Sequence, residues 1–137
     1  MKNSYSILIV ENDEDEQYFI REGFQTSDKF RILALLRNGN ELFEWLEEHP
    51  DARPDLILSD LNMPGKNGYD IIREMRRHPV HSGVPVIITS TSSAPVIMQR
   101  CLTMGAAHYL VKPDTFIEYP DFVNRLYEVV RGAVPEP

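Results

Sequence analysis

Hydrophobic residues gather in five short runs that recur along the chain, at residues 7–10, 32–36, 56–58, 86–88 and 109–111. Four of the runs are rich in β-branched or aromatic residues, which favours strands, whereas the composition of 32–36 fits a strand or a helix. Consecutive apolar residues, rather than alternating apolar and polar positions, are typical of strands covered on both faces. The pattern therefore predicts strands buried inside a layered fold.

Between and after these runs, apolar residues follow the spacing of amphipathic helices, at 19–24, 42–46, 71–75, 97–104 and 122–130. Gly105 follows the fourth of these segments, where a helix C-cap glycine belongs. Strands that alternate with helices predict βαβ units, and right-handed crossovers then place helices on both faces of a parallel sheet. We expect one α/β domain over residues 1–137, with a core at about 5–131 and a flexible tail at 132–137.

Composition and charge exclude several classes of protein and function. The chain is 42% hydrophobic and 26% charged, which is ordinary for a globular protein and excludes a disordered one. Its 14 basic and 21 acidic residues give a net charge of −7, which argues against contacts with nucleic acid or anionic membranes. The single cysteine, Cys101, excludes an internal disulfide and a thiolate metal cage. No apolar run approaches the ~20 residues that span a bilayer, so a cytoplasmic protein is expected.

Polar residues follow the predicted strands at the point where each strand ends. In open parallel sheets, ligands bind outside the carboxyl ends of the strands, so these residues are the candidates for chemistry. They are Glu11, Asn12 and Asp13 after the first strand, Asp60 after the third, Thr89, Ser90 and Thr91 after the fourth, and Lys112 after the fifth. One edge of the sheet is therefore expected to gather acids, an amide, hydroxyls and a single ammonium group.

Four segments in this order resemble the receiver domain of two-component response regulators. They are Ile-Leu-Ile-Val-Glu-Asn-Asp at 7–13, the segment 55–68 that includes Asp60 and Met-Pro-Gly, Pro-Val-Ile-Ile-Thr-Ser at 85–90, and Val-Lys-Pro at 111–113. The resemblance covers residues 5 to 131. Within the family, the sequence is similar to stand-alone regulators linked to phytochrome-type kinases. It implies a flavodoxin-like (βα)5 doubly wound parallel sheet with strand order 2-1-3-4-5.

The resemblance also implies a role for each polar residue. Asp60 would be the phosphoacceptor, since an ionised carboxylate can attack a phosphohistidine and become an aspartyl phosphate. Mg²⁺ would be held by Glu11, Asp60 and the backbone carbonyl of Asn62, because this ion prefers carboxylates, waters and phosphate oxygens. Lys112 would pair with the phosphoryl group as a point charge. Ser90 would donate its hydroxyl to a phosphoryl oxygen.

The family's switch is expected at two of these positions. Ser90 lies five residues after Pro85, which is the family's spacing, whereas Thr89 and Thr91 differ from it by one residue. Tyr109, three residues before Lys112, stands at the place of the switch aromatic. Phosphorylation would recruit the Ser90 hydroxyl, and Tyr109 would turn from exposed to buried. The alternative for Tyr109 is an amphipathic surface tyrosine.

One position departs from the family pattern. Receivers usually carry two acids after the first strand, and the second binds the metal directly, but here Asn12 follows Glu11. An amide oxygen can ligate Mg²⁺ but brings no charge, so the metal would bind more weakly unless Asp13 substitutes for it. Asp13 can instead be the N-cap of the first helix. Asp15 and Glu16 then lie in that helix's first turn, where we expect only a favourable interaction with the helix dipole.

The function expected from the resemblance is phosphorylation-gated signalling. The chain would accept phosphate from a histidine kinase or a phosphotransfer protein and hydrolyse it slowly. The surface of the fourth helix, fifth strand and fifth helix would contact a downstream partner or a second copy. One alternative is a receiver-like interaction module that does not depend on phosphorylation, which Asn12 favours. Another is an enzyme on the same fold, but a phosphatase would want an acid at Asn62, and Glu11 and Asp13 would repel a flavin phosphate.

Overall fold

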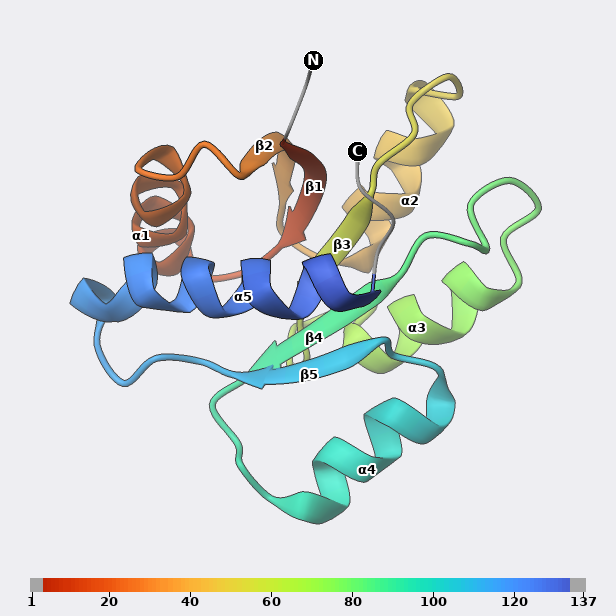
Figure 1. Cartoon of the computed structure of the whole chain (residues 1–137). Helices are drawn as coiled ribbons and strands as arrows, with labels where there is room; N and C mark the ends of the chain where they lie inside the picture. The colour runs from red at the N-terminus through yellow and green to blue at the C-terminus, as the bar shows by residue number, and fades with distance from the viewer. Residues whose placement is uncertain (1–3, 134–137) are drawn as a thin grey trace.

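The computed structural model describes residues 4–133 and contains every predicted strand and helix (Figure 1). The strands are β1 Tyr5–Val10, β2 Phe30–Leu36, β3 Leu56–Asp60, β4 Val86–Ser90 and β5 His108–Val111. The helices are α1 Glu14–Gln25, α2 Gly39–Glu48, α3 Gly68–Arg76, α4 Pro95–Met104 and α5 Tyr119–Ala133, with a short 3₁₀ helix, η1 Phe116–Glu118. The run 32–36, which fitted either state, is a strand. Residues 132 and 133 form the end of α5 rather than a tail, and 134–137 lie outside the described residues.

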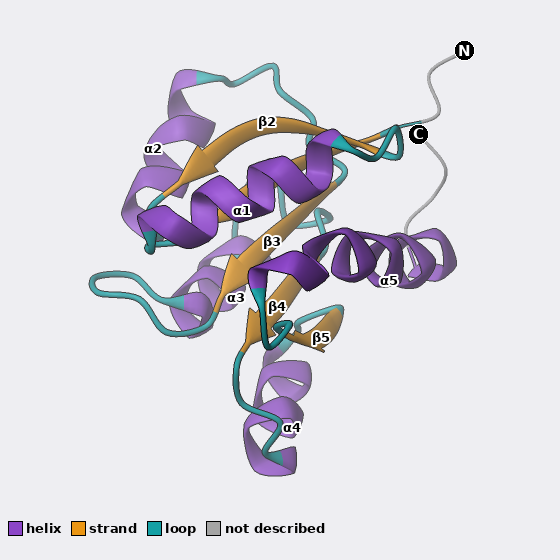
Figure 2. Ribbon diagram, turned by 90° about the vertical axis from the view of Figure 1, so that its left-hand side faces the viewer, coloured by secondary structure: helices purple, strands orange, loops and turns teal. Residues whose placement is uncertain are grey.

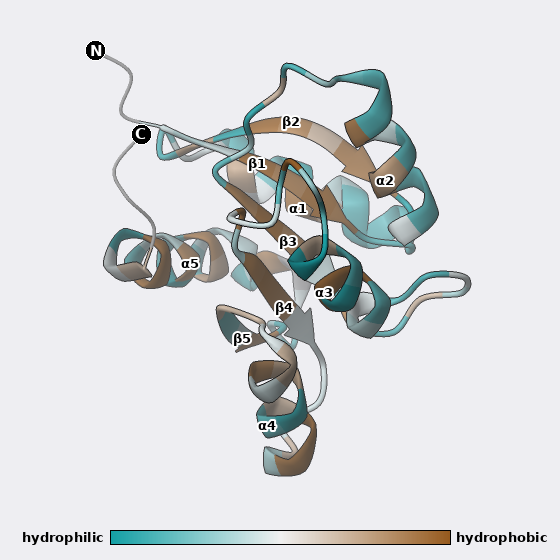
Figure 3. Cartoon of the chain, turned by 90° about the vertical axis from the view of Figure 1, so that its right-hand side faces the viewer, coloured by the Kyte–Doolittle hydropathy of each residue, from teal (hydrophilic) through white to brown (hydrophobic). Residues whose placement is uncertain are grey.

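The five strands form one parallel sheet in the order β2-β1-β3-β4-β5, as expected for a flavodoxin-like fold. Helices α1 and α5 pack side by side over one face of the sheet (Figure 2). Helices α2, α3 and α4 cover the other face, and Figure 3 shows the hydrophobic strands β1, β3 and β4 behind them. The core therefore lies in two layers, one on each side of the sheet, which explains why the strands read as continuous apolar runs.

Strand register brings the predicted site residues to one edge. Asp60 lies opposite Thr89, and Ser90 lies opposite Val111, so the ends of β3, β4 and β5 are level. Side chains alternate between the two faces of a sheet. Because Leu58 belongs to the core layer beneath α1 and α5, Asp60 points to that face. Ser90 points to the other face, on the side of α3 and α4, because Val86 and Ile88 of the same strand belong to that core layer.

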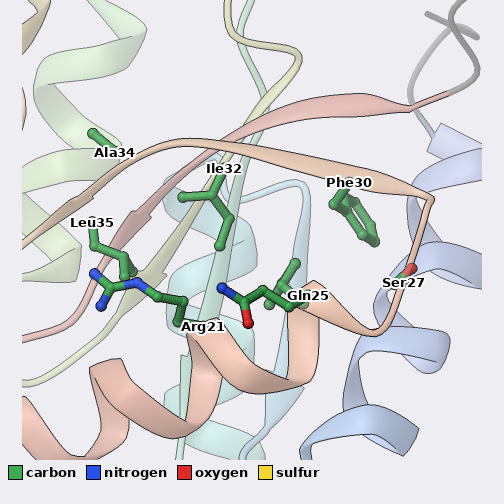
Figure 4. A pocket seen from close by; sticks show the side chains of 8 residues that line it. Arg21, Gln25, Ser27, Phe30, Ile32, Ala34 and Leu35 are labelled. Atoms are coloured by element: carbon green, nitrogen blue, oxygen red, sulfur yellow. The ribbon is translucent and has the colours of Figure 1, made fainter.

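The chain also has a surface hollow of about 480 Å³ between α1 and β2 (Figure 4). Residues of α1 and β2, with Ser27 between them, line it: Arg21, Phe24, Gln25, Ser27, Phe30, Ile32, Ala34 and Leu35. None of the residues at the carboxyl edge of the sheet is among them. The hollow is therefore separate from the predicted site.

Candidate functional site

The ammonium group of Lys112 lies at the centre of the carboxyl edge. Its Nζ atom is 2.9 Å from Glu11 Oε1, 2.8 Å from Glu16 Oε2 and 3.3 Å from Asp60 Oδ1. The Lys112 side chain is only 7% exposed. The structure thus brings together Glu11, Asp60 and Lys112, three of the residues that the sequence predicts at this edge.

The pocket holds more negative than positive charge. Burial and the charge of Asp60 raise the pKa of Glu11 to about 7, although Lys112 opposes the rise. Burial also raises the pKa of Asp60, again against the effect of Lys112. Burial alone would lower the pKa of Lys112, but the charges of Asp60 and Glu11 outweigh it and raise that pKa. Three carboxyl groups around one ammonium form a site that a further cation would stabilise.

Asp60 is held in a fixed orientation at the end of β3. Its Oδ1 atom accepts a hydrogen bond of 2.9 Å from the backbone N–H of Leu61, besides its contact with Lys112. The residue retains 9% exposure, the largest among the buried polar residues of this edge. A carboxylate that is oriented, charged and still reachable from outside is suited to act as a nucleophile.

Ser90 and Tyr109 are linked through Ser92. The Ser90 hydroxyl oxygen accepts a hydrogen bond of 3.2 Å from the Ser92 N–H, and the Tyr109 hydroxyl donates one of 2.8 Å to the Ser92 carbonyl. Tyr109 is buried rather than exposed on the surface. Thr89, the alternative to Ser90 one residue earlier in the sequence, is also buried, and its hydroxyl has no hydrogen-bond partner among the described residues. Both hydroxyls are therefore close to the sheet edge, one on each face.

Asp13 serves as the N-cap of α1, one of the two roles open to it from the sequence. Its Oδ1 atom accepts a hydrogen bond of 2.9 Å from the Glu16 N–H, and its own N–H donates to Glu11 Oε2 at 3.1 Å. Asn12 and Asn62 are both exposed. The cap engages the Asp13 side chain with the helix, which leaves Glu11, Glu16 and Asp60 as the carboxylates around Lys112.

These carboxylates suit a hard divalent cation. Within residues 4–133, no three or more His, Cys, Asp or Glu side chains are arranged as a complete metal cage. Mg²⁺ does not require one, because it is usually held by one or two carboxylates, with waters and phosphate oxygens completing the octahedron. The donor set of Glu11 and Asp60 therefore fits this ion, and their excess negative charge favours it.

Glu16 is the site residue that sequence reasoning missed. We expected it to interact only with the helix dipole, but its carboxylate contacts Lys112 and accepts a hydrogen bond of 3.1 Å from the Tyr119 hydroxyl. Burial and the charge of Glu16 raise the pKa of Tyr119. The expected N-cap at Asp13 could have indicated the role of Glu16, because a helix that starts after Asp13 holds its first turn beside the end of β1. Tyr119 gave no such signal.

The sequence matches the model of the response regulator receiver domain over residues 7–121, and the chain belongs to this family of two-component signalling domains. It is 35% identical over 118 residues to the two-component response regulator ORR8 of Oryza sativa subsp. indica, covering 86% of this chain and 94% of ORR8. Other relatives are longer. The chain is 30% identical over 112 residues to the response regulator-like APRR5 of Arabidopsis thaliana, covering 82% of this chain but only 20% of APRR5.

Solved structures agree with the fold. The Mn²⁺-bound form of response regulator Rcp1 superposes with a TM-score of 0.80 and 25% identity over 97% of this chain and 99% of Rcp1. The phosphorylated cyanobacterial phytochrome response regulator RcpA superposes with a TM-score of 0.83 and 24% identity over 98% and 99%. Receiver domains act with histidine kinases or phosphotransfer proteins and take Mg²⁺ or Mn²⁺ at the phosphorylation site. Among residues 4–133, no helix combines the length and apolar character needed to cross a bilayer.

Proposed function

We propose that this chain is a single receiver domain that accepts a phosphoryl group on Asp60 from a histidine kinase or a phosphotransfer protein. The observation that carries the proposal is the buried Lys112 ammonium 3.3 Å from Asp60 Oδ1, at the carboxyl edge of a parallel sheet. The family model supports it, as does the existence of a phosphorylated form of RcpA. A donor of this kind acts in the cytoplasm, where we place the protein.

The transfer is a displacement at phosphorus. An Asp60 carboxylate oxygen forms a bond to phosphorus while the bond between phosphorus and the donor's histidine nitrogen breaks, and the electron pair leaves with the imidazole. Lys112 stabilises the charge on the phosphoryl oxygens, and the Ser90 hydroxyl donates a hydrogen bond to one of them. Catalysis consists mostly of positioning and charge stabilisation, as in phosphoryl transfer generally.

Glu11, Asp60 and the backbone carbonyl of Asn62 would hold Mg²⁺ at this site. When bound, the ion neutralises the repulsion between the carboxylates and the incoming phosphoryl group. Asn12 would contribute at most a neutral oxygen, because it stands where the family's second acid is found. Asp13 is the weaker candidate, since its side chain caps α1.

Signalling follows from the link between Ser90 and Tyr109. When the Ser90 hydroxyl turns to the phosphoryl group, its oxygen shifts relative to the Ser92 N–H that donates to it, and the Ser92 carbonyl accepts from the Tyr109 hydroxyl. The change therefore reaches the surface formed by α4, β5 and α5. Val96 on α4 is 80% exposed and Leu102 is 41% exposed, which suits an apolar contact with a downstream protein or a second copy.

Acetyl phosphate with Mg²⁺ tests the phosphoacceptor directly. We expect a mass gain of one phosphoryl group in the wild-type protein and none in Asp60→Asn or in the presence of EDTA. Asp51→Asn, which removes an exposed carboxylate remote from the pocket, is the matched control and should behave as wild type. An equal gain in Asp60→Asn would overturn the assignment. No gain in any variant would support a receiver-like interaction module that works without phosphorylation, the alternative that Asn12 favours.

A further inference from the structure

Glu16 connects the pocket to the start of α5. Its Oε2 atom lies 2.8 Å from Lys112 Nζ and 3.1 Å from the Tyr119 hydroxyl. The Lys112 side chain is 7% exposed and the Glu16 side chain 20%, while Tyr119 is 3% exposed as a residue. Helix α1 therefore meets the end of β5 and the start of α5, which come much later in the sequence, at one carboxylate.

Tyr119 is fixed in place by close packing. A Cβ atom built on Gly23 of α1 would lie 3.0 Å from Tyr119 Cβ and 3.3 Å from its carbonyl carbon, so glycine is what permits the two helices to approach here. This contact holds the Tyr119 backbone and Cβ, while burial and an edge contact with the Phe122 ring leave the Tyr119 ring little room to follow Glu16 if that side chain moves. The hydroxyl is therefore a fixed point that holds the Glu16 carboxylate toward Lys112.

Lys112 cannot keep all its carboxylate partners once a phosphoryl group arrives. An ammonium group has three donors, and Glu11, Glu16 and Asp60 already lie within reach of them. Under the proposed function, on which this inference rests, Asp60 carries the phosphoryl group and Glu11 faces the metal. Glu16 is the partner with neither task, so it is the one that Lys112 can release.

We propose that Glu16 is a positioning residue that holds Lys112 toward α1 before transfer, while Tyr119 holds Glu16. We call these two contacts the latch. The latch must open for Lys112 to reach the phosphoryl group. The latch has two consequences. It adds a negative charge beside the path of the anionic donor, which weakens donor binding. It also ties the opening to Tyr119, the residue that follows η1 and begins α5.

Small phosphodonors of different charge separate a latch from a merely structural contact. Glu16→Gln keeps the size and an acceptor oxygen but removes the charge, so we expect its KM for acetyl phosphate, a dianion, to fall by about fivefold. The fall should be smaller for phosphoramidate, which carries less negative charge. Tyr119→Phe, which removes only the hydroxyl, should shift KM in the same direction by less. Asp15→Asn deletes an exposed charge from the same turn of α1 and should leave both KM values unchanged.

Amide hydrogen exchange provides a second readout that does not depend on turnover. In the wild-type protein, phosphorylation should speed exchange at η1 and the start of α5. Glu16→Gln and Tyr119→Phe should show faster exchange there before phosphorylation, and Asp15→Asn should not. Circular dichroism of each variant confirms that the fold is retained.

The outcomes separate the two proposals. If the wild-type protein is phosphorylated but Glu16→Gln matches Asp15→Asn in KM and in exchange, the latch is wrong and the phosphoacceptor assignment stands. A rise in KM on Glu16→Gln also overturns the latch, because Glu16 would then assist donor binding. If the wild-type protein accepts no phosphoryl group from either donor, the proposed function fails, and the latch fails with it.

Discussion

Replacing Lys112 with methionine is expected to lower the free energy of unfolding by about 3–5 kcal/mol near pH 8. The Lys112 side chain is 7% exposed, and its ammonium group is the partner of Glu11, Glu16 and Asp60 in the pocket. Methionine preserves much of the apolar stem but removes the charge. The buried carboxylates therefore lose the positive charge that offsets their own. The expected loss exceeds that of a surface ion pair by several-fold, because solvent screens a surface pair.

The loss is also expected to depend on pH. Burial and Asp60 already raise the folded-state pKa of Glu11 from 4.5 to about 7, and removal of the ammonium raises it further. A carboxyl group whose folded pKa lies above its unfolded value stabilises the fold below the unfolded pKa, and this contribution is lost as pH rises through the folded pKa. The destabilisation by Lys112→Met should therefore be smaller near pH 5, where the carboxylates take up protons, than near pH 8.

Urea denaturation in EDTA at the two pH values measures this prediction. Lys66→Met is the matched control, since Lys66 pairs with Glu74 at 2.6 Å but its side chain is 36% exposed. The control should lose about 1 kcal/mol or less, with little dependence on pH. If Lys112→Met loses no more than Lys66→Met, or loses the same amount at both pH values, the account of a charge-compensated pocket is wrong.

Asn12→Asp is expected to tighten Mg²⁺ binding, on the order of tenfold, since ligand charge is one of the main determinants of affinity at such sites. The change restores a second acid directly after Glu11, where the family pattern has one. Calorimetric titration with Mg²⁺ compares the two proteins at the same ionic strength. The gain should be largest above pH 7, because Glu11 is then deprotonated and available to the ion.

Asp13→Asn is the control for this titration. An asparagine keeps the N-cap of α1 in place while it removes the Asp13 charge, so Mg²⁺ affinity should change little. Unchanged affinity in Asn12→Asp would contradict the view that Asn12 weakens the site. A large loss in Asp13→Asn would instead identify Asp13 as the substitute ligand.

The fold could be predicted from sequence because both faces of the sheet are covered. Strands β1, β3 and β4 lie between two core layers, so they read as continuous apolar runs. The run 32–36 was ambiguous for a physical reason: β2 is an edge strand with intermediate burial at four successive positions, 32–35. Its alternation with the flanking helices, rather than its composition, identified it as a strand.

From the sequence, only the site residues that directly follow a strand could be predicted. Glu11, Asp60 and Lys112 follow strands, and a level parallel register brings them together. Glu16 and Tyr119 come from helices, and their meeting depends on how closely α1 and α5 pack. Apolar periodicity gives the face that a helix buries but not the distance between two helices, so this contact could be found only in the structure.

Locating the phosphoryl group tests the central claim most directly. After reaction with acetyl phosphate and Mg²⁺, the protein is digested, and the modified peptide is mapped by mass spectrometry with and without hydroxylamine. We predict a single acyl phosphate on the peptide that contains Asp60, removed by hydroxylamine. A phosphoryl group on Ser90, Thr89 or another side chain, stable to hydroxylamine or present in Asp60→Asn, would contradict the assignment of Asp60 as the phosphoacceptor.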